Sequence, residues 1–228
     1  RQLQAPRERT VVETLLLAVP RVSTFNGPFA LTGASGFFFE RDERLYLVTS
    51  RHVLIDEPSG HLPDRIEIEM HTDERNLSQS AVLSLLLYED GKAVWHQARD
   101  SGGDIDVAAI QIDRKILRGA APHAFTLEHL QEPLGDVEIG TPLVVVGFPL
   151  GFHDSTYHLP VARQAVVASS FGTRFQGQGL FLTDARTHRG TSGAPVVTRA
   201  PVGAQQENAR LPWKLLGVHS MRMDMLSR

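Results

Sequence analysis

Gly190-Thr191-Ser192-Gly193-Ala194-Pro195 is the stretch that decides how the rest of the chain is interpreted. It places one serine between glycines, immediately before the apolar run Ala194-Pro195-Val196-Val197. Glycine permits the unusual dihedral angles and the close approach that are needed where backbone amides must face a developing negative charge. An ordinary Gly-Ser turn between two strands has the same composition. The meaning of this stretch thus depends on partners elsewhere in the chain.

Two such partners lie upstream. His52 follows the strand-like run 45–49, and Asp106 opens the apolar run 106–110. A serine hydroxyl is a poor nucleophile until an imidazole accepts its proton, and the imidazole needs a carboxylate to fix its tautomer. We therefore predict Ser192 as nucleophile, His52 as general base and Asp106 as its orienting carboxylate. Asp104 competes for the last role, but it follows two glycines and is interpreted as a turn residue.

A serine nucleophile also requires backbone amides that bind the oxyanion. The backbone N–H groups of Gly190 and Ser192 are the candidates for an oxyanion hole, because glycine lets a turn present amides inward. The alternative is that His52 is a buried or capping histidine. The chain has ten histidines, so one of them can match the catalytic pattern by chance.

Bulk properties exclude several classes of function. The 228 residues are 42% hydrophobic, which is enough for a sizeable core, and the net charge of −3 indicates no strong field for nucleic acid or an anionic membrane. No cysteine is present, so disulfides, thiol catalysis and zinc–thiolate sites are excluded. We expect no metal, no cofactor and no membrane span, and a polypeptide as the partner. The oligomeric state stays open.

The N-terminal residues and the cysteine content bear on processing and on the cellular compartment. No signal peptide is visible and residue 1 is Arg, so we expect the chain to begin after processing or after residues that precede it. The absence of cysteine fits both a cytoplasmic and a bacterial periplasmic or secreted protein.

The pattern along the chain is typical of an all-β fold, a barrel or sandwich. Short apolar runs are separated by Gly, Pro and Asp, and we expect strands at 36–39, 45–49, 65–70, 81–87, 105–112, 142–147, 161–169, 179–183, 194–198 and 214–219. One short helix is expected at 124–131. Residues 113–138 are interpreted as a connection between two halves, and residues 199–212 as a surface loop. His52 and Asp106 fall in the first half and Ser192 in the second, which predicts a site between them.

Taken together, these motifs resemble the trypsin-like serine peptidases, nearest to the bacterial HtrA/Deg-like and glutamyl-endopeptidase branches. The resemblance covers about 33–220 and rests on four stretches: Gly33-Ala34-Ser35-Gly36-Phe37 with Leu47-Val48-Thr49-Ser50-Arg51-His52-Val53, Asp104 to Ile110, Val144 to Gly151, and Thr183-Asp184-Ala185 with Gly190 to Pro195. It implies a chymotrypsin-like fold of two perpendicular six-stranded β-barrels with the triad between them. One peptidase domain, 1–228, would comprise a first barrel at about 10–115, a connection at about 113–138 and a second barrel at about 139–228.

The resemblance also implies a specificity. In glutamyl-endopeptidases and viral 3C-like peptidases, a Thr or Ser and a His at the places of Thr187 and His219 hold an acidic or Gln side chain. A hydroxyl and an imidazole donate hydrogen bonds to such a group. Arg186 and His188, with Arg189, would add positive potential. The alternative is that His219 is a packed strand histidine and the cations are solvated.

Other classes of function have sequence signatures that can be compared with this chain. A catalytically impaired pseudopeptidase that binds peptides would share the fold, and the few residues after Ser220 motivate it, since a peptidase of this type usually continues further. An α/β-hydrolase would need G-x-S-x-G, and position 194 is Ala. The chain has no H-E-x-x-H for a metallopeptidase and no phosphate-binding G-x-x-x-x-G-K-[ST].

Overall fold

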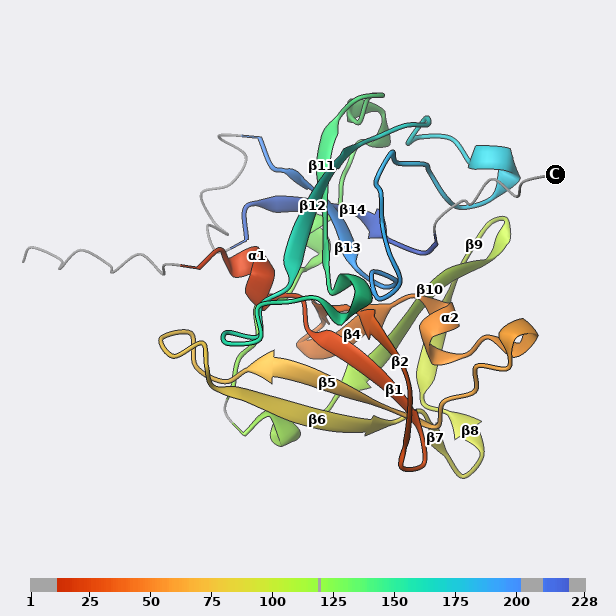
Figure 1. The fold of residues 1–228 in the computed structure, drawn as a ribbon. Coiled ribbons are helices and arrows are strands. Elements are labelled where there is room, and N and C mark those ends of the chain that lie inside the picture. Colours follow the sequence, from red (N-terminus) through yellow and green to blue (C-terminus); the bar gives the residue numbers. More distant parts are fainter. Residues whose placement is uncertain (1–11, 119, 202–210, 222–228) are drawn as a thin grey trace, which may run out of the picture.

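The computed structural model of the protein describes residues 12–118, 120–201 and 211–221. Strands dominate these residues, so the all-β prediction is confirmed. The strands are β1 (Arg21–Asn26), β2 (Phe29–Ser35), β3 (Phe37–Arg41), β4 (Arg44–Thr49), β5 (Arg65–His71), β6 (Ser80–Leu86), β7 (Tyr88–Glu89), β8 (Lys92–Ala93), β9 (Trp95–Asp100), β10 (Gly103–Ile112), β11 (Pro142–Gly147), β12 (Val161–Val166), β13 (Pro195–Arg199) and β14 (Trp213–Val218) (Figure 1). Two one-turn helices, α1 (Thr14–Leu17) and α2 (Arg51–Leu54), accompany them.

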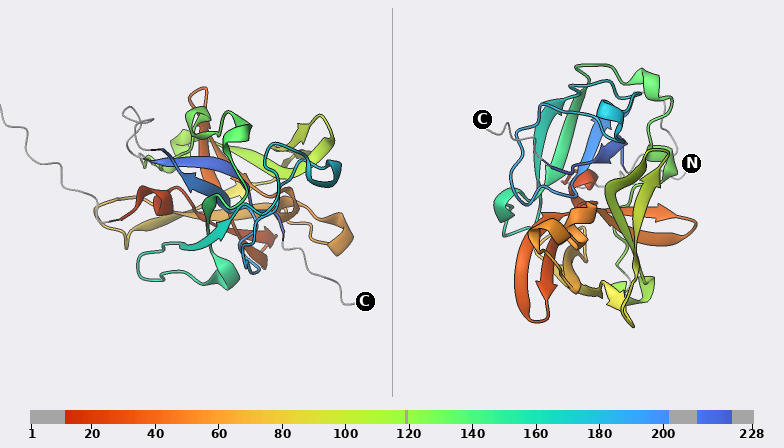
Figure 2. Two further views of the ribbon diagram at one scale, coloured as in Figure 1. Left: turned by 90° about the horizontal axis from the view of Figure 1, so that it is seen from above. Right: turned by 90° about the vertical axis from the view of Figure 1, so that its right-hand side faces the viewer.

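The strands form two groups that pair only internally. In the first half, β1 to β10, the sheets have the orders β2-β1-β5-β6 and β3-β4-β10-β9, with the small hairpin β7-β8 beside them. In the second half, β11 to β14, the order is β12-β11-β13-β14. Figure 2 shows the two groups stacked on one another. Their named strands pair antiparallel throughout, unlike the mostly parallel sheet of an α/β-hydrolase. Closure of each half into a six-stranded barrel stays a prediction.

Each half has its own apolar core. Along β5 the burial alternates with the period of two that a strand with one covered face requires, and Ile66, Ile68 and Met70 point inward. These three pack in one cluster with Phe38, Leu47 and Ile110. A second cluster in the second half includes Leu143, Val145 and Val196.

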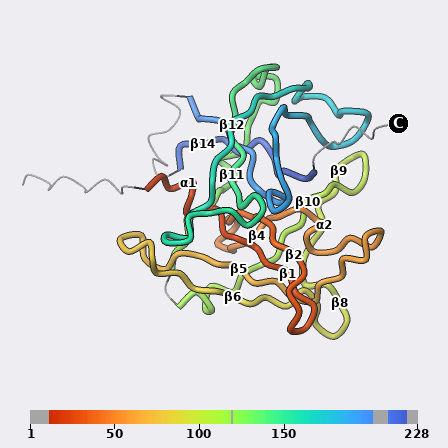
Figure 3. The backbone as a smooth tube through the Cα atoms, in the orientation of Figure 1, coloured from red at the N-terminus to blue at the C-terminus, as the bar shows by residue number. Residues whose placement is uncertain are grey.

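A third cluster joins the two halves. Phe37 of β3 meets Phe125 edge to face, with ring centroids 5.5 Å apart, and both packed rings belong to a cluster with Phe148 and Val197 of the second half. Leu15 of α1 enters the same cluster. Truncating a buried Phe to Ala typically costs about 3–5 kcal/mol, so this contact is large enough to fix how the halves sit. Figure 3 traces the backbone through both groups of strands.

Two predicted elements differ from the structure. The predicted helix at 124–131 is only a 3₁₀ turn, Leu127–His129, because Thr126 N–H donates to His129 Nδ1 at 2.8 Å and closes the segment after one turn. The predicted strand at 179–183 is wrong. Only an isolated bridge, Val167↔Thr183, forms there, and the preceding chain turns at the 3₁₀ helix Phe175–Gly177, where Gly177 has φ +76°. Most of the predicted loop at 199–212 lies outside the described residues.

Candidate active site

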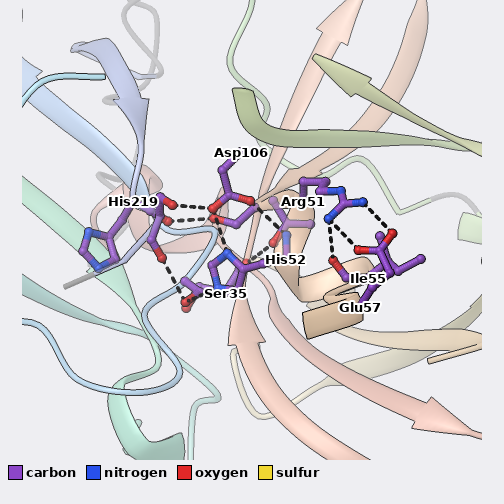
Figure 4. Close-up of polar contacts among 11 residues, drawn as sticks. Ser35, Arg51, His52, Ile55, Glu57, Asp106 and His219 are labelled. Carbon is purple, nitrogen blue, oxygen red and sulfur yellow. Dashed lines mark hydrogen bonds and ion pairs between the residues drawn. The ribbon is translucent and has the colours of Figure 1, made fainter. Parts of the chain in front are cut away.

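The three residues predicted to act on the substrate come from three different elements. His52 lies on α2, the single helical turn that follows β4. Asp106 lies in β10 where its pairing with β9 is irregular, between Asp104 and Ala108. Ser192 lies in the turn that precedes β13. His52 Nδ1 is 2.7 Å from Asp106 Oδ2, and His52 Nε2 is 3.0 Å from Ser192 Oγ (Figure 4). The structure thus brings all three together.

Asp106 is bound by two groups of His52, the backbone N–H and the imidazole. The His52 backbone N–H donates to Asp106 Oδ1 at 2.9 Å, so the same carboxylate fixes both the α2 backbone and its imidazole. Asp104, the competing carboxylate, forms an exposed ion pair with Arg99 Nε at 2.5 Å instead. The two aspartates therefore have different neighbours, and only Asp106 meets His52.

Ser220 adds a contact that the sequence did not indicate. Its hydroxyl donates to Asp106 Oδ2, and its carbonyl oxygen is 3.2 Å from Ser192 Oγ. Burial acts to raise the pKa of Asp106, but the hydrogen bonds from His52 and Ser220 and the attraction to His52 outweigh it, so this pKa lies below its usual value. Asp106 is therefore a carboxylate at neutral pH. The only signal for Ser220 is its place directly after His219.

The turn before Ser192 leaves two amides free. From Gly190 to Ala194, the N–H groups of Thr191, Gly193 and Ala194 donate to backbone carbonyls at 2.8–3.2 Å. Those of Gly190 and Ser192 have no partner among the described residues. Gly190 has φ +92°, and a Cβ there would lie 2.3 Å from the Phe148 carbonyl oxygen. Glycine is thus required at the first of the two predicted oxyanion donors.

The residues predicted to contact the substrate side chain divide by exposure. Thr187 is buried, with 3% of its surface exposed, whereas Arg186 and His188 are exposed, as is Arg189. His219 directly follows β14 and extends its ladder, because its N–H donates to the Ala194 carbonyl at 2.8 Å. In Figure 4 its imidazole points away from the His52–Asp106 pair.

The His219 imidazole is neutral at physiological pH. Burial, with a smaller contribution from the charge of His52, lowers its pKa from 6.5 to about 4. Among the described residues, neither this ring nor the Thr187 hydroxyl has a hydrogen-bond partner. Both side chains therefore keep an unused donor.

The described residues offer neither a metal site nor a membrane-spanning helix. No group of three or more His, Cys, Asp or Glu side chains is arranged to hold a metal ion there. No helix in that part of the chain has the length and hydrophobicity that crossing a membrane requires.

Comparisons with known proteins concern the family and the fold. The family model described as a trypsin-like peptidase domain matches residues 34–201. Among solved structures, the serine endoprotease from Yersinia pestis has a TM-score of 0.55 at 17% identity, and covers 96% of this chain and 60% of its own. The HtrA-type protease AlgW with a tripeptide has a TM-score of 0.50 at 16% identity, and covers 85% of this chain and 51% of its own. The chain thus spans little more than half of either protein, and at these identities the likeness concerns the fold. No curated protein matches the sequence.

Proposed function

The chain belongs to the trypsin-like peptidase family and is a serine-type peptidase, and we propose that it cleaves polypeptides through an acyl-enzyme formed on Ser192. The observation that carries this proposal is the unbroken series of contacts Asp106–His52–Ser192, at 2.7 and 3.0 Å, beside two amides that have no partner among the described residues. Each part of that series has a defined chemical role.

Asp106 sets the tautomer of His52. A carboxylate can only accept a hydrogen bond, so the proton of the neutral imidazole lies on Nδ1 and the lone pair on Nε2 faces Ser192 Oγ. As Oγ forms a bond to the substrate carbonyl carbon, its proton passes to Nε2. The Asp106 carboxylate then stabilises the imidazolium.

The amides of Gly190 and Ser192 receive the negative charge. When Oγ attacks, the carbonyl π electrons move onto oxygen, and two preorganised N–H groups compensate that charge without reorganisation. Collapse of the tetrahedral intermediate breaks the C–N bond, and His52 donates its proton to the leaving amine. Water, activated by the same imidazole, then hydrolyses the ester and regenerates the Ser192 hydroxyl.

For specificity we propose Glu, Asp or Gln immediately before the scissile bond. The support is the pair of unused donors, the Thr187 hydroxyl and the neutral His219 imidazole. A bound carboxylate would also attract a proton to His219, because an opposite charge favours the charged form of an imidazole. Arg186 and His188, both exposed, would add positive potential at the rim.

The experiment is cleavage of a proteome-derived peptide library by the wild type and by His219→Ala, with Ser192→Ala as the control for contaminating proteases. We expect cleavage after Glu, Asp or Gln. Leaving a buried acceptor uncompensated costs about 1–3 kcal/mol, so kcat/KM for Glu peptides should fall roughly 5- to 150-fold in His219→Ala. His96→Ala, which removes an exposed imidazole on β9 of the first half, should change it little.

Two other outcomes would overturn parts of this proposal. Cleavage after Arg, Lys or large apolar residues, unaffected by His219→Ala, refutes the specificity and leaves the acyl-enzyme intact. Failure of the wild type to react with a fluorophosphonate, which labels activated serines, would refute the assignment of Ser192 and favour a peptide-binding pseudopeptidase.

A further inference from the structure

Ser35 lies outside the triad and makes two hydrogen bonds to the turn that carries Ser192. It ends β2 in the first half and is fully buried, with 0% of its surface exposed. Its Oγ donates to the Gly190 carbonyl at 2.7 Å and accepts from Phe148 N–H at 3.0 Å. Its backbone N–H donates to the Ser192 carbonyl at 2.9 Å. Its own carbonyl accepts from Thr49 Oγ1 at 2.8 Å, which fixes Ser35 to β4. Figure 4 includes Ser35 among the polar contacts of the site.

These bonds account for the carbonyl groups of the turn. His188 and Thr191 carbonyls accept from amides within the turn, those of Thr191 and Ala194. The Gly190 and Ser192 carbonyls both accept from Ser35. Every carbonyl from 188 to 192 is thus paired. The partner is a group of the turn itself or of Ser35 in each case except that of the Arg189 carbonyl.

The Arg189 carbonyl is also linked to Ser35, at one remove. It accepts from Leu150 N–H at 2.5 Å. Leu150 lies two residues after Phe148, whose own N–H is held by Ser35 Oγ. One hydroxyl therefore bridges the chain at 148 to the turn at 190 and keeps Leu150 within reach of Arg189.

The carbonyls determine where the amides point. In a planar trans peptide the C=O and N–H groups face opposite directions. The Gly190 N–H shares a peptide with the Arg189 carbonyl, and the Ser192 N–H shares one with the Thr191 carbonyl. The carbonyls that Ser35 binds belong to the next peptides, Gly190–Thr191 and Ser192–Gly193, so Ser35 restrains each of the two amides through the residue to which the amide belongs. Glycine has more backbone freedom than any other residue type, and Gly190 has φ +92°. The peptides on either side of Gly190 therefore reorient easily unless hydrogen bonds hold their carbonyls.

We propose that Ser35 is a positioning residue that holds the Gly190 and Ser192 amides in the orientation needed to bind the oxyanion. The proposal rests on the proposed acyl-enzyme mechanism. Ser35 belongs to the first half, whereas the Gly190 and Ser192 donors that it orients belong to the second half.

The test compares Ser35→Ala with Thr24→Ala. Thr24 is equally buried, and its hydroxyl bonds Thr32 within the first half, away from the site. Active sites are counted by the end point of fluorophosphonate labelling, so that the folded fraction is known. Per active site, Ser35→Ala should lower kcat about 10- to 100-fold with little change in KM, because a misplacement of about 1 Å can cost 10²-fold. Thr24→Ala should keep the wild-type kcat.

A second measurement separates positioning from loss of structure. A peptide aldehyde binds by forming a tetrahedral adduct with an oxyanion, whereas the matching peptide alcohol forms none. Ser35→Ala should weaken the aldehyde by the same factor as kcat and leave the alcohol unchanged. If Ser35→Ala yields too little folded protein, Ser35→Cys, which keeps a weaker donor, should fall between Ala and Ser in both measurements.

The outcomes distinguish the two proposals. Equal kcat per active site in Ser35→Ala and Thr24→Ala, or equal weakening of aldehyde and alcohol, overturns the role of Ser35 while the wild type still forms its acyl-enzyme. A wild type that neither labels nor cleaves overturns the proposed function itself.

Discussion

Replacing His219 by Asn should make the protein less sensitive to acid. The folded state holds this imidazole neutral, with its pKa lowered from 6.5 to about 4 by burial and by the charge of His52. In the unfolded chain the same ring takes up a proton near its ordinary value. Between these two values the unfolded state binds more protons, so stability is complete above pH 6.5 and is lost as the pH falls toward 4.

The magnitude follows from the two pKa values. A difference of one pH unit corresponds to about 1.4 kcal/mol, so this one ring should reduce the free energy of unfolding by about 2 kcal/mol at pH 5 and about 3 kcal/mol at pH 4. A domain is typically stable by about 5–15 kcal/mol, so the effect is large enough to measure. Asn cannot titrate, and His219→Asn should abolish this part of the acid sensitivity.

Urea unfolding between pH 7.5 and pH 4, followed by the fluorescence of the two tryptophans, measures the effect. The quantity compared is the change in the free energy of unfolding with pH, wild type against variant. His129, whose pKa is also lowered chiefly by burial, contributes in the same direction in both proteins and cancels in the difference. His188→Asn, an exposed position, should keep the wild-type pH dependence. Parallel curves for the wild type and His219→Asn would refute the reasoning.

Two further predictions concern the geometry of the site. Gly190→Ala should lower kcat by about 100-fold or more, because φ is +92° and the new Cβ would meet the Phe148 carbonyl; Gly27→Ala, with φ +53° and open space, is the matched control, and equal kinetics in both would contradict it. Ser220→Ala should let the pKa of Asp106 rise toward its usual value, so kcat/KM should fall more at pH 5 than at pH 8; a uniform loss across the pH profile would speak against this role of Ser220.

The sequence was most informative where a function depends on neighbours along the chain. Ser192, His52 and Asp106 each stand in local text that limits their conformation, and the structure brings the three side chains within hydrogen-bond distance. Nine of the ten predicted strands form, because alternation such as that of β5 is a local signal, whereas β1, β2, β7, β8 and β9 were not predicted.

The sequence was least informative where a role comes from contacts across the fold. Ser35 is 155 residues from Gly190, and Ser220 is 114 residues from Asp106, so no periodicity or spacing links them. The segment 179–183 has the composition of a strand, but a strand needs a partner along its length. Only two residues of the segment, Leu182 and Thr183, pair with the chain at 167–169.

The division of the site between two independently cored halves has a consequence for how activity is lost. His52 and Asp106 belong to the first half, whereas Ser192 and the Gly190 amide belong to the second half. The 3.0 Å distance between His52 Nε2 and Ser192 Oγ therefore depends on how the two halves pack against one another. A displacement of about 1 Å between the halves, too small to break any sheet, would disrupt this contact and the proposed activity while the secondary structure stays intact.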